Sequence, residues 1–163
     1  MKLSTKGRYA VMAMADLASA SAGSPVTLGE IASRQSISLS YLEQLFAKLR
    51  RANVVSSVRG PGGGYRLARD ASEIRVSDII TAVDEPLRAT RCSNAKGCLA
   101  DGRRCVTHDL WDELSRHIFL FLSSVTLEDV VDRRLQGSAR GAIGLLDRAM
   151  AHPEGALSPA AAE

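Results

Sequence analysis

The apolar residues of the first fifty positions follow helical spacing, broken where a helix can begin or end. A first helix is expected over about 6–20, because this stretch lacks proline and its only glycine, Gly7, lies at the start. Thr27 and Glu30 stand three residues apart in a capping-box pattern, which predicts a second, short helix ending near Gln35.

A third helix carries the clearest apolar stripe. We expect a tight turn at Ser36-Ile37, after which Ser38 or Ser40 caps the helix. The positions expected to be buried recur at helical spacing: Leu42, Leu45, Phe46 and Leu49. The positions expected on the opposite side are mostly polar: Tyr41, Glu43, Gln44 and Lys48. Two short helices joined by a tight turn predict a helix-turn-helix.

A two-stranded ribbon is predicted directly after this motif. One strand is expected over 54–58 and its partner over 65–67, since both are rich in strand-forming residues. The composition of Arg59-Gly-Pro-Gly-Gly-Gly64 between them is typical of a turn. A ribbon in this position makes the motif a winged helix, so the fold class is mainly α with a small β-ribbon.

The second half of the chain predicts further helices. A short one is expected over 76–83 and a long one over about 107–124. The long helix has two adjacent apolar stripes, formed by Leu110, Leu114, Phe121 and Val125 and by Trp111, Ile118 and Leu122. So wide an apolar surface indicates an intersubunit helix pair. Thr126 to Asp129 is expected to cap a last helix that ends near Leu135.

These patterns divide the chain into four parts. We expect a winged helix-turn-helix domain over 1–85, a ligand-bearing loop over 86–108, and a dimerisation helix with a short following helix over 107–135. The Gly, Ala, Ser and Pro content rises after this point, so 136–163 is expected to be a flexible tail.

Charge is distributed unevenly along the 163 residues. Residues 1–69 contain 10 Lys/Arg and 3 Asp/Glu, whereas the remaining residues contain 11 and 15. A basic first half favours a polyanion partner, and the predicted motif makes that partner double-stranded DNA. The run from Pro61 to Gly64 is not a nucleotide-binding P-loop, because no Gly-Lys-Ser/Thr follows it.

The winged-helix prediction assigns roles on DNA. The second helix of the motif is expected in the major groove, where four residues reach bases or phosphates: Ser40, Tyr41, Glu43 and Gln44. The ribbon tip is expected at a minor groove, with Arg59 entering it and the backbone approaching closely at Gly60, Pro61, Gly62 and Gly63. Phosphate contacts are expected from Lys48, Arg50, Arg51, Arg66 and Arg69. The alternative is that these charges form an ordinary solvated face.

The three cysteines of the chain lie in one segment with a histidine, in the pattern Cys92-x5-Cys98-x6-Cys105-x2-His108. Three thiolates and an imidazole complete a metal coordination shell. The shell suits structural zinc, but the wide x5 and x6 gaps slightly favour an iron–sulfur cluster. Three unrelated thiols in a loop, or a Cys–His thiol enzyme, are the remaining readings. The latter ranks low because no oxyanion device or orienting residue is visible.

An odd, clustered set of cysteines also points to a reducing cytoplasm. The segment from Tyr9 to Ala15 follows two lysines as in a signal peptide, but Asp16 interrupts it and the residues suit an amphipathic helix. No apolar run approaches the ~20 residues needed to span a bilayer, so no membrane is expected as a partner. No small-molecule substrate is expected for a DNA-binding protein of this kind either.

Three segments resemble the IscR-type iron–sulfur cluster regulators: 1–10, 38–46 and 58–65. The resemblance covers about 1–135, including the Cys/Cys/Cys/His segment. It implies a homodimeric winged-helix transcription factor that is not an enzyme and typically represses cluster assembly genes. It also implies a [2Fe–2S] cluster with Cys92, Cys98, Cys105 and His108 as ligands, and a role for Glu43 in choosing between types of DNA site. The gap before Cys105 is one residue longer than the family's usual spacing.

Overall fold

The computed structural model describes four stretches of the chain: 4–21, 24–85, 98–99 and 102–136. The chain divides into two units, 1–132 and 133–163, and each is described by itself. Cys92, most of the predicted ligand loop and nearly all of the predicted tail lie outside the described residues.

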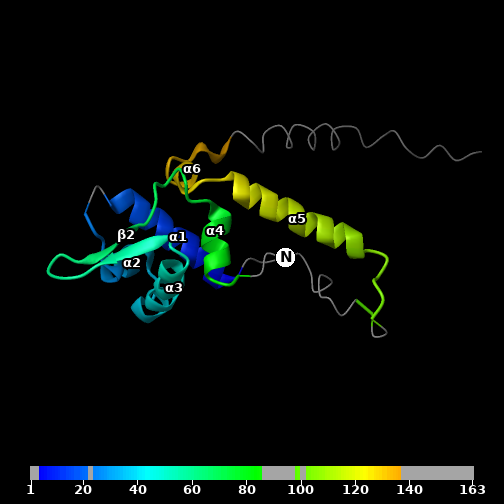
Figure 1. Ribbon diagram of the computed structural model, residues 1–163, viewed down its shortest axis with the longest axis horizontal. Helices are drawn as coiled ribbons and strands as arrows, with labels where there is room; N and C mark the ends of the chain where they lie inside the picture. The colour runs from blue at the N-terminus through cyan, green and yellow to red at the C-terminus, as the bar shows by residue number, and fades with distance from the viewer. Residues whose placement is uncertain (1–3, 22–23, 86–97, 100–101, 137–163) are drawn as a thin grey trace, which may run out of the picture. The chain divides into compact units, whose positions relative to one another are not determined.

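The first unit holds six helices and one two-stranded sheet among its described residues (Figure 1). In chain order they are α1 (Thr5–Ala20), α2 (Leu28–Gln35), α3 (Leu39–Arg51), β1 (Val55–Val58), β2 (Gly64–Leu67), α4 (Val76–Ala82), α5 (His108–Ser124) and α6 (Leu127–Val131). In the second unit the described residues include one 3-10 turn, η2 (Arg134–Gln136). The order and approximate bounds of the predicted elements are therefore confirmed up to α5.

Local signals in the sequence start and stop these helices as expected. The Thr27 hydroxyl accepts a hydrogen bond from the Glu30 amide at 3.3 Å, and the Glu30 carboxylate accepts one from the Thr27 amide at 2.7 Å. These bonds satisfy two amides that α2 itself leaves unpaired. Ser36 then turns the chain in a left-handed conformation (φ 53°), and Ser38, rather than Ser40, caps α3.

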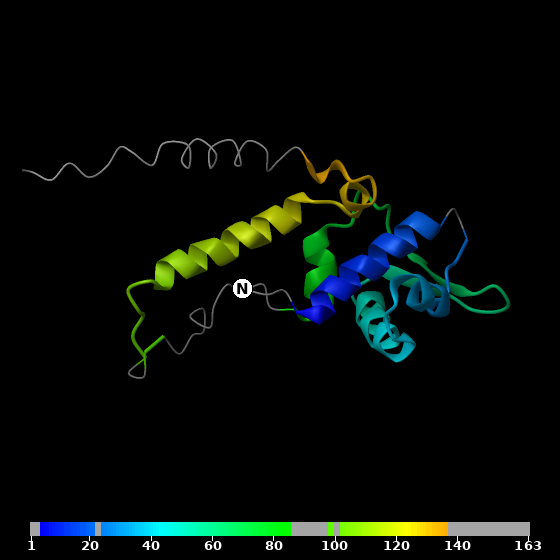
Figure 2. The ribbon, with the colours of Figure 1, turned by 180° about the vertical axis from the view of Figure 1, so that it is seen from behind.

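The core forms where α1, α2, α3 and the sheet meet. The predicted stripe of α3 is buried throughout, with Leu42, Phe46 and Leu49 fully inaccessible to solvent. The ring of Phe46 packs edge-on against Tyr65 of β2, with 4.9 Å between ring centroids, and so joins the recognition motif to the ribbon. Figures 1 and 2 show α2 and α3 lying beside α1, which contributes Met14 and other buried residues.

The ribbon is an antiparallel hairpin in which Val55 pairs with Leu67 and Val58 with Gly64. A third segment holds its edge, because the Val26 and Tyr65 backbones exchange hydrogen bonds of 2.9 and 2.7 Å. The two backbones approach closely at Gly64, where an added Cβ would lie 2.5 Å from the carbonyl oxygen of Val26. Strand β2, which begins one residue before the predicted strand, therefore requires a glycine at its first residue, Gly64.

Helix α4 contacts both α1 and α5. The chain that leaves α5 is tied to the start of α4, since the Val76 amide donates to the Val125 carbonyl at 3.0 Å and the Leu127 amide donates to the Ile74 carbonyl at 2.8 Å. Among the helices that the structure describes, none has the length and apolar character needed to cross a membrane.

The last helix is shorter than predicted. Its capping residues are confirmed, because the Thr126 hydroxyl accepts from the Asp129 amide at 3.0 Å. The expected end near Leu135 is wrong, however, since α6 ends at Val131 and Arg133 adopts a left-handed conformation (φ 55°). Leu127 is the buried residue of this helix.

Candidate nucleic-acid interface and ligand segment

The first turns of α3 present a polar surface on the side away from the core. Ser40, Glu43 and Gln44 are exposed, as expected for side chains that would face DNA bases. Tyr41 is different: it is half-buried, packs against the core and contacts Tyr9 edge-on with ring centroids 6.0 Å apart. The expectation that Tyr41 projects wholly away from the core is therefore wrong, because its ring covers the junction between α1 and α3.

The tip of the hairpin is open and carries one cation. Arg59 is exposed and makes no ion pair or hydrogen bond with any residue that the structure describes. Gly60 and Gly62 have positive φ angles of 105° and 72°, and a Cβ added to either would meet no atom within 4 Å. Gly63 is crowded instead, since its Cβ would lie 2.4 Å from the Val58 carbonyl oxygen. The tip is thus held by Gly63 and is free to approach another molecule at Gly60 and Gly62.

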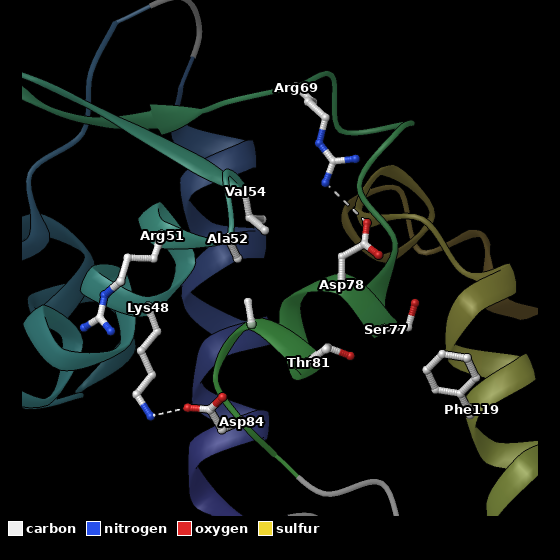
Figure 3. Close-up of a pocket in the computed structure, with 11 residues that line it drawn as sticks. Lys48, Arg51, Ala52, Val54, Arg69, Ser77, Asp78, Thr81, Asp84 and Phe119 are labelled. Atoms are coloured by element: carbon white, nitrogen blue, oxygen red, sulfur yellow. Dashed lines mark hydrogen bonds and ion pairs between the residues drawn. The ribbon is translucent and has the colours of Figure 1, made fainter.

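Two of the predicted phosphate-binding cations already have partners in the protein. Lys48 Nζ lies 2.7 Å from Asp84 Oδ2, and Arg69 lies 3.4 Å from Asp78 Oδ2. Hydrogen bonding and charge from Lys48 hold the pKa of Asp84 below its ordinary value. Figure 3 shows both pairs on the wall of a pocket of about 650 Å³ that α3, α4 and Phe119 of α5 line. Exposed Arg50, Arg51 and Arg66 remain on the surface with Arg59.

The described part of the ligand segment brings two predicted ligands together. Cys98 Sγ lies 3.0 Å from Nδ1 of His108, a residue that is only 8% exposed at the first position of α5. A turn places the cysteine there, because the amides of Cys98 and Leu99 both donate to the Arg103 carbonyl, at 3.0 and 3.1 Å. Gly102 permits this turn with a φ of 81°. These hydrogen bonds bring Cys98 close to Arg103, two residues before Cys105, although the gap between the two cysteines is one residue longer than usual in the family.

Cys105 approaches the same helix end by another route. Its carbonyl accepts a hydrogen bond from the His108 amide at 3.0 Å, and its Sγ lies 3.6 Å from the hydroxyl of Thr107. That hydroxyl also accepts from the Trp111 indole at 3.2 Å. Sequence reasoning missed Thr107 and treated Trp111 as packing only. The adjacency of Thr107 to two predicted ligands was the available signal.

Among the described residues, no group of three or more His, Cys, Asp or Glu side chains is close enough to hold a metal ion. One predicted ligand, Cys92, lies outside the described part of the chain. The structure therefore provides two ligands in contact and a third at the same helix terminus, and the ligand assignments stay predictions.

Comparison with known proteins identifies the chain. The model of the Rrf2 family, described as iron-dependent transcriptional regulators, matches residues 3–133. This chain belongs to the Rrf2 family. The HTH-type transcriptional regulator IscR of Photorhabdus laumondii is 58% identical to this Rrf2 protein over 134 residues, which cover 82% of this chain and 81% of that relative. IscR of Serratia proteamaculans is 56% identical with the same coverage.

Solved structures agree. IscR of T. potens has 39% sequence identity and a TM-score of 0.66, and the match covers 85% of this chain and 91% of that one. CymR, the global cysteine regulator of B. subtilis, has 34% identity and a TM-score of 0.69, covering 82% and 98%. The winged-helix fold class and the resemblance to IscR-type regulators are confirmed. This Rrf2 protein is a DNA-binding transcriptional regulator and not an enzyme.

Proposed function

We propose that this protein is a homodimeric transcriptional repressor of iron–sulfur cluster assembly genes that senses a [2Fe–2S] cluster through Cys92, Cys98, Cys105 and His108. The observation that supports it most is the contact between Cys98 and His108 at the start of α5. Thiolate ligands of this kind need a reducing compartment, so we place the protein in the cytoplasm.

The chemistry of the donors fits the cluster. Cysteine thiolates hold iron–sulfur clusters, and histidine replaces cysteine on some of them. For comparison, zinc bonds of about 2.3 Å to sulfur and 2.0–2.1 Å to nitrogen keep two ligands of one tetrahedral ion roughly 3.5 Å apart. The 3.0 Å between Cys98 Sγ and His108 Nδ1 needs only a small separation to reach this value. A bound cluster would supply a redox-active centre whose assembly depends on iron and sulfide.

The proposed DNA interface consists of the exposed face of α3 and the hairpin tip. Gln44 suits bidentate contact with an adenine, whereas Glu43 accepts from a cytosine amine and repels phosphates, so it selects among sites. Arg59 contributes charge at a narrow minor groove. Arg50, Arg51 and Arg66 supply phosphate contacts, which fix the position of the protein without reading the sequence.

The proposed dimer interface lies on α5. His108 is the only residue of this helix that the first unit buries, while Leu110 remains 61% exposed, Leu120 58% and Phe121 47%. Exposed apolar surface of this extent on a regular helix favours burial against another chain. A second copy is the occupant we propose, since a twofold axis would present the same stripe from each subunit.

The ligand segment is attached at both ends to the parts that it would have to control. On its N-terminal side, Asp84 binds Lys48 of α3, and its carbonyl accepts from Lys6 of α1 at 2.8 Å. On its C-terminal side, His108 begins the proposed dimer helix. Ligation by residues of this segment would therefore bias the position of α3 relative to α5. Such coupling requires a different DNA affinity in the two states.

The test combines metal analysis with DNA binding. Anaerobically purified protein should contain two irons and two sulfides per chain, with a visible charge-transfer spectrum. His108→Ala should lose that spectrum, whereas His117→Ala should keep it, because His117 is exposed on the same helix and bonds only Glu113 among the described residues. If the purified protein instead contained one equivalent of zinc and no sulfide, the cluster assignment would be wrong and the site would be a structural zinc site. The Cys105-x2-His108 spacing also suits zinc.

A further inference from the structure

Among the helices that the structure describes, three have a threonine at the N-cap position, and one of these threonines behaves differently. The hydroxyls of Thr27 and Thr126 accept hydrogen bonds from Glu30 and Asp129 amides, as a capping residue does. Thr107 precedes α5 but makes no capping bond with its side chain. Its φ and ψ of −96° and 8° also differ from the extended conformation of the other two. Its hydroxyl is therefore directed to side chains and not to the unpaired amides at the start of α5.

The partners of this hydroxyl are a predicted ligand and an indole. Cys105 Sγ lies 3.6 Å from Thr107 Oγ1, and Trp111 Nε1 lies 3.2 Å from the same oxygen. An indole nitrogen only donates, so the threonine oxygen accepts from Trp111. The hydroxyl proton is then left for the sulfur. A ligating thiolate carries no proton, so in the ligated state the hydrogen bond runs from Thr107 to Cys105.

We propose that Thr107 is a positioning residue for the Cys105 sulfur, held in place by Trp111, and that its hydrogen bond raises the reduction potential of the bound cluster. This inference rests on the proposed function. Reduction adds one electron and hence one negative charge, and no bond forms or breaks. A donor to a ligating sulfur stabilises the more negative state, and such hydrogen bonds are among the determinants of cluster potentials.

The expected effect on the equilibrium between reduced and oxidised protein is at most about tenfold, because the hydrogen bond exists in both oxidation states and its whole contribution, about that factor, sets the upper limit. For a one-electron couple, tenfold corresponds to about 59 mV. The potential would be measured on the reconstituted full-length protein by an anaerobic titration with redox mediators, followed by visible absorption. Thr107→Val keeps the side-chain shape without the hydroxyl and should lower the potential. Thr107→Ser keeps the hydroxyl and should restore it.

Trp111 provides an independent readout, because it is the only tryptophan in the chain. Its emission spectrum should shift in Thr107→Val, which loses the acceptor, and not in Thr107→Ser. Trp111→Phe should also lower the reduction potential, but by less than Thr107→Val does. The Thr107 hydroxyl stays in this variant but loses the hydrogen bond that positions it. Loss of the cluster in Thr107→Val but not in Thr107→Ser would also support the inference, because the two variants differ in the hydroxyl that positions the Cys105 sulfur.

Two results would overturn the inference. Equal potentials in the wild type, Thr107→Val and Thr107→Ser would remove the role of the hydroxyl and leave the cluster assignment intact. Loss of the cluster in both variants would show that the hydroxyl is not the determinant. Wild-type protein without sulfide is a separate outcome, which contradicts the proposed function and removes this inference with it.

Discussion

Replacing Arg59 with alanine tests the role of the hairpin tip on DNA. The guanidinium is exposed and has no partner among the described residues, so its loss breaks no observed contact within the protein. The tip backbone should be unaffected, because Gly63 closes the turn through a 2.9 Å hydrogen bond to the Gly60 carbonyl. Any loss of DNA affinity in Arg59→Ala can then be assigned to the missing contact.

The size of the effect follows from counterion release. Each phosphate neutralised contributes about −0.9 to the slope of log affinity against log salt on B-form DNA. A dimer that loses one contact per subunit should therefore show a slope smaller by about 1.8. Between 50 and 200 mM salt, the wild-type affinity should fall about tenfold more than that of Arg59→Ala.

Fluorescence anisotropy with a labelled operator, titrated at several salt concentrations, measures this slope. The matched control is Arg116→Ala, which removes the same charge from α5, where the guanidinium binds Asp112 at 3.1 Å and also contacts Glu113. Its slope should equal that of the wild type. An unchanged slope in Arg59→Ala, or an equal decrease in the control, would refute a specific phosphate or minor-groove contact at the tip.

Three further substitutions test other parts of the structure. Gly63→Ala forces a Cβ against the Val58 carbonyl and should weaken DNA binding with little change in far-UV circular dichroism. Gly60→Ala should weaken DNA binding less, because the added Cβ meets no atom and only the positive φ of Gly60 is unfavourable for alanine. Phe46→Ala should lower the free energy of unfolding by about 3–5 kcal/mol in urea titrations, because the ring is fully buried. Leu110→Arg should shift the protein from dimer to monomer in sedimentation, and an unchanged dimer would contradict the α5 interface.

The sequence predicted those elements whose signals are local. Thr27 with Glu30 forms a reciprocal pair within one turn, so the start of α2 follows from four residues. The stripe of α3 is buried as its spacing indicates, since helical geometry alone places Leu42 and Phe46 on one face.

Features that depend on contacts between distant segments could not be predicted. Lys48 was expected to bind a DNA phosphate, but it pairs with the carboxylate of Asp84. The two residues lie 36 positions apart in the sequence, so no local pattern indicates the pair. The burial of Tyr41 depends on Tyr9, a residue of another helix. The end of α6 was missed because a left-handed residue, Arg133, has no marker such as glycine in the sequence.

The ligand segment shows the same division. The residue types and spacing predicted a coordination shell. They did not predict that Cys98 contacts His108, or that a turn with hydrogen bonds to the Arg103 carbonyl brings it there. The sequence also did not predict the proposed role of the Thr107 hydroxyl, because a threonine before a helix is ordinarily a capping residue.

The central claim is that ligation at the Cys/Cys/Cys/His segment changes DNA binding. The most direct measurement compares one operator's affinity for anaerobically reconstituted protein and for the same preparation after removal of iron and sulfide. His117→Ala is the control that should respond as the wild type does. The account predicts a clear difference in affinity between the two states, which His108→Ala should abolish. Equal affinities of the cluster-loaded dimer and the cluster-free dimer would contradict it.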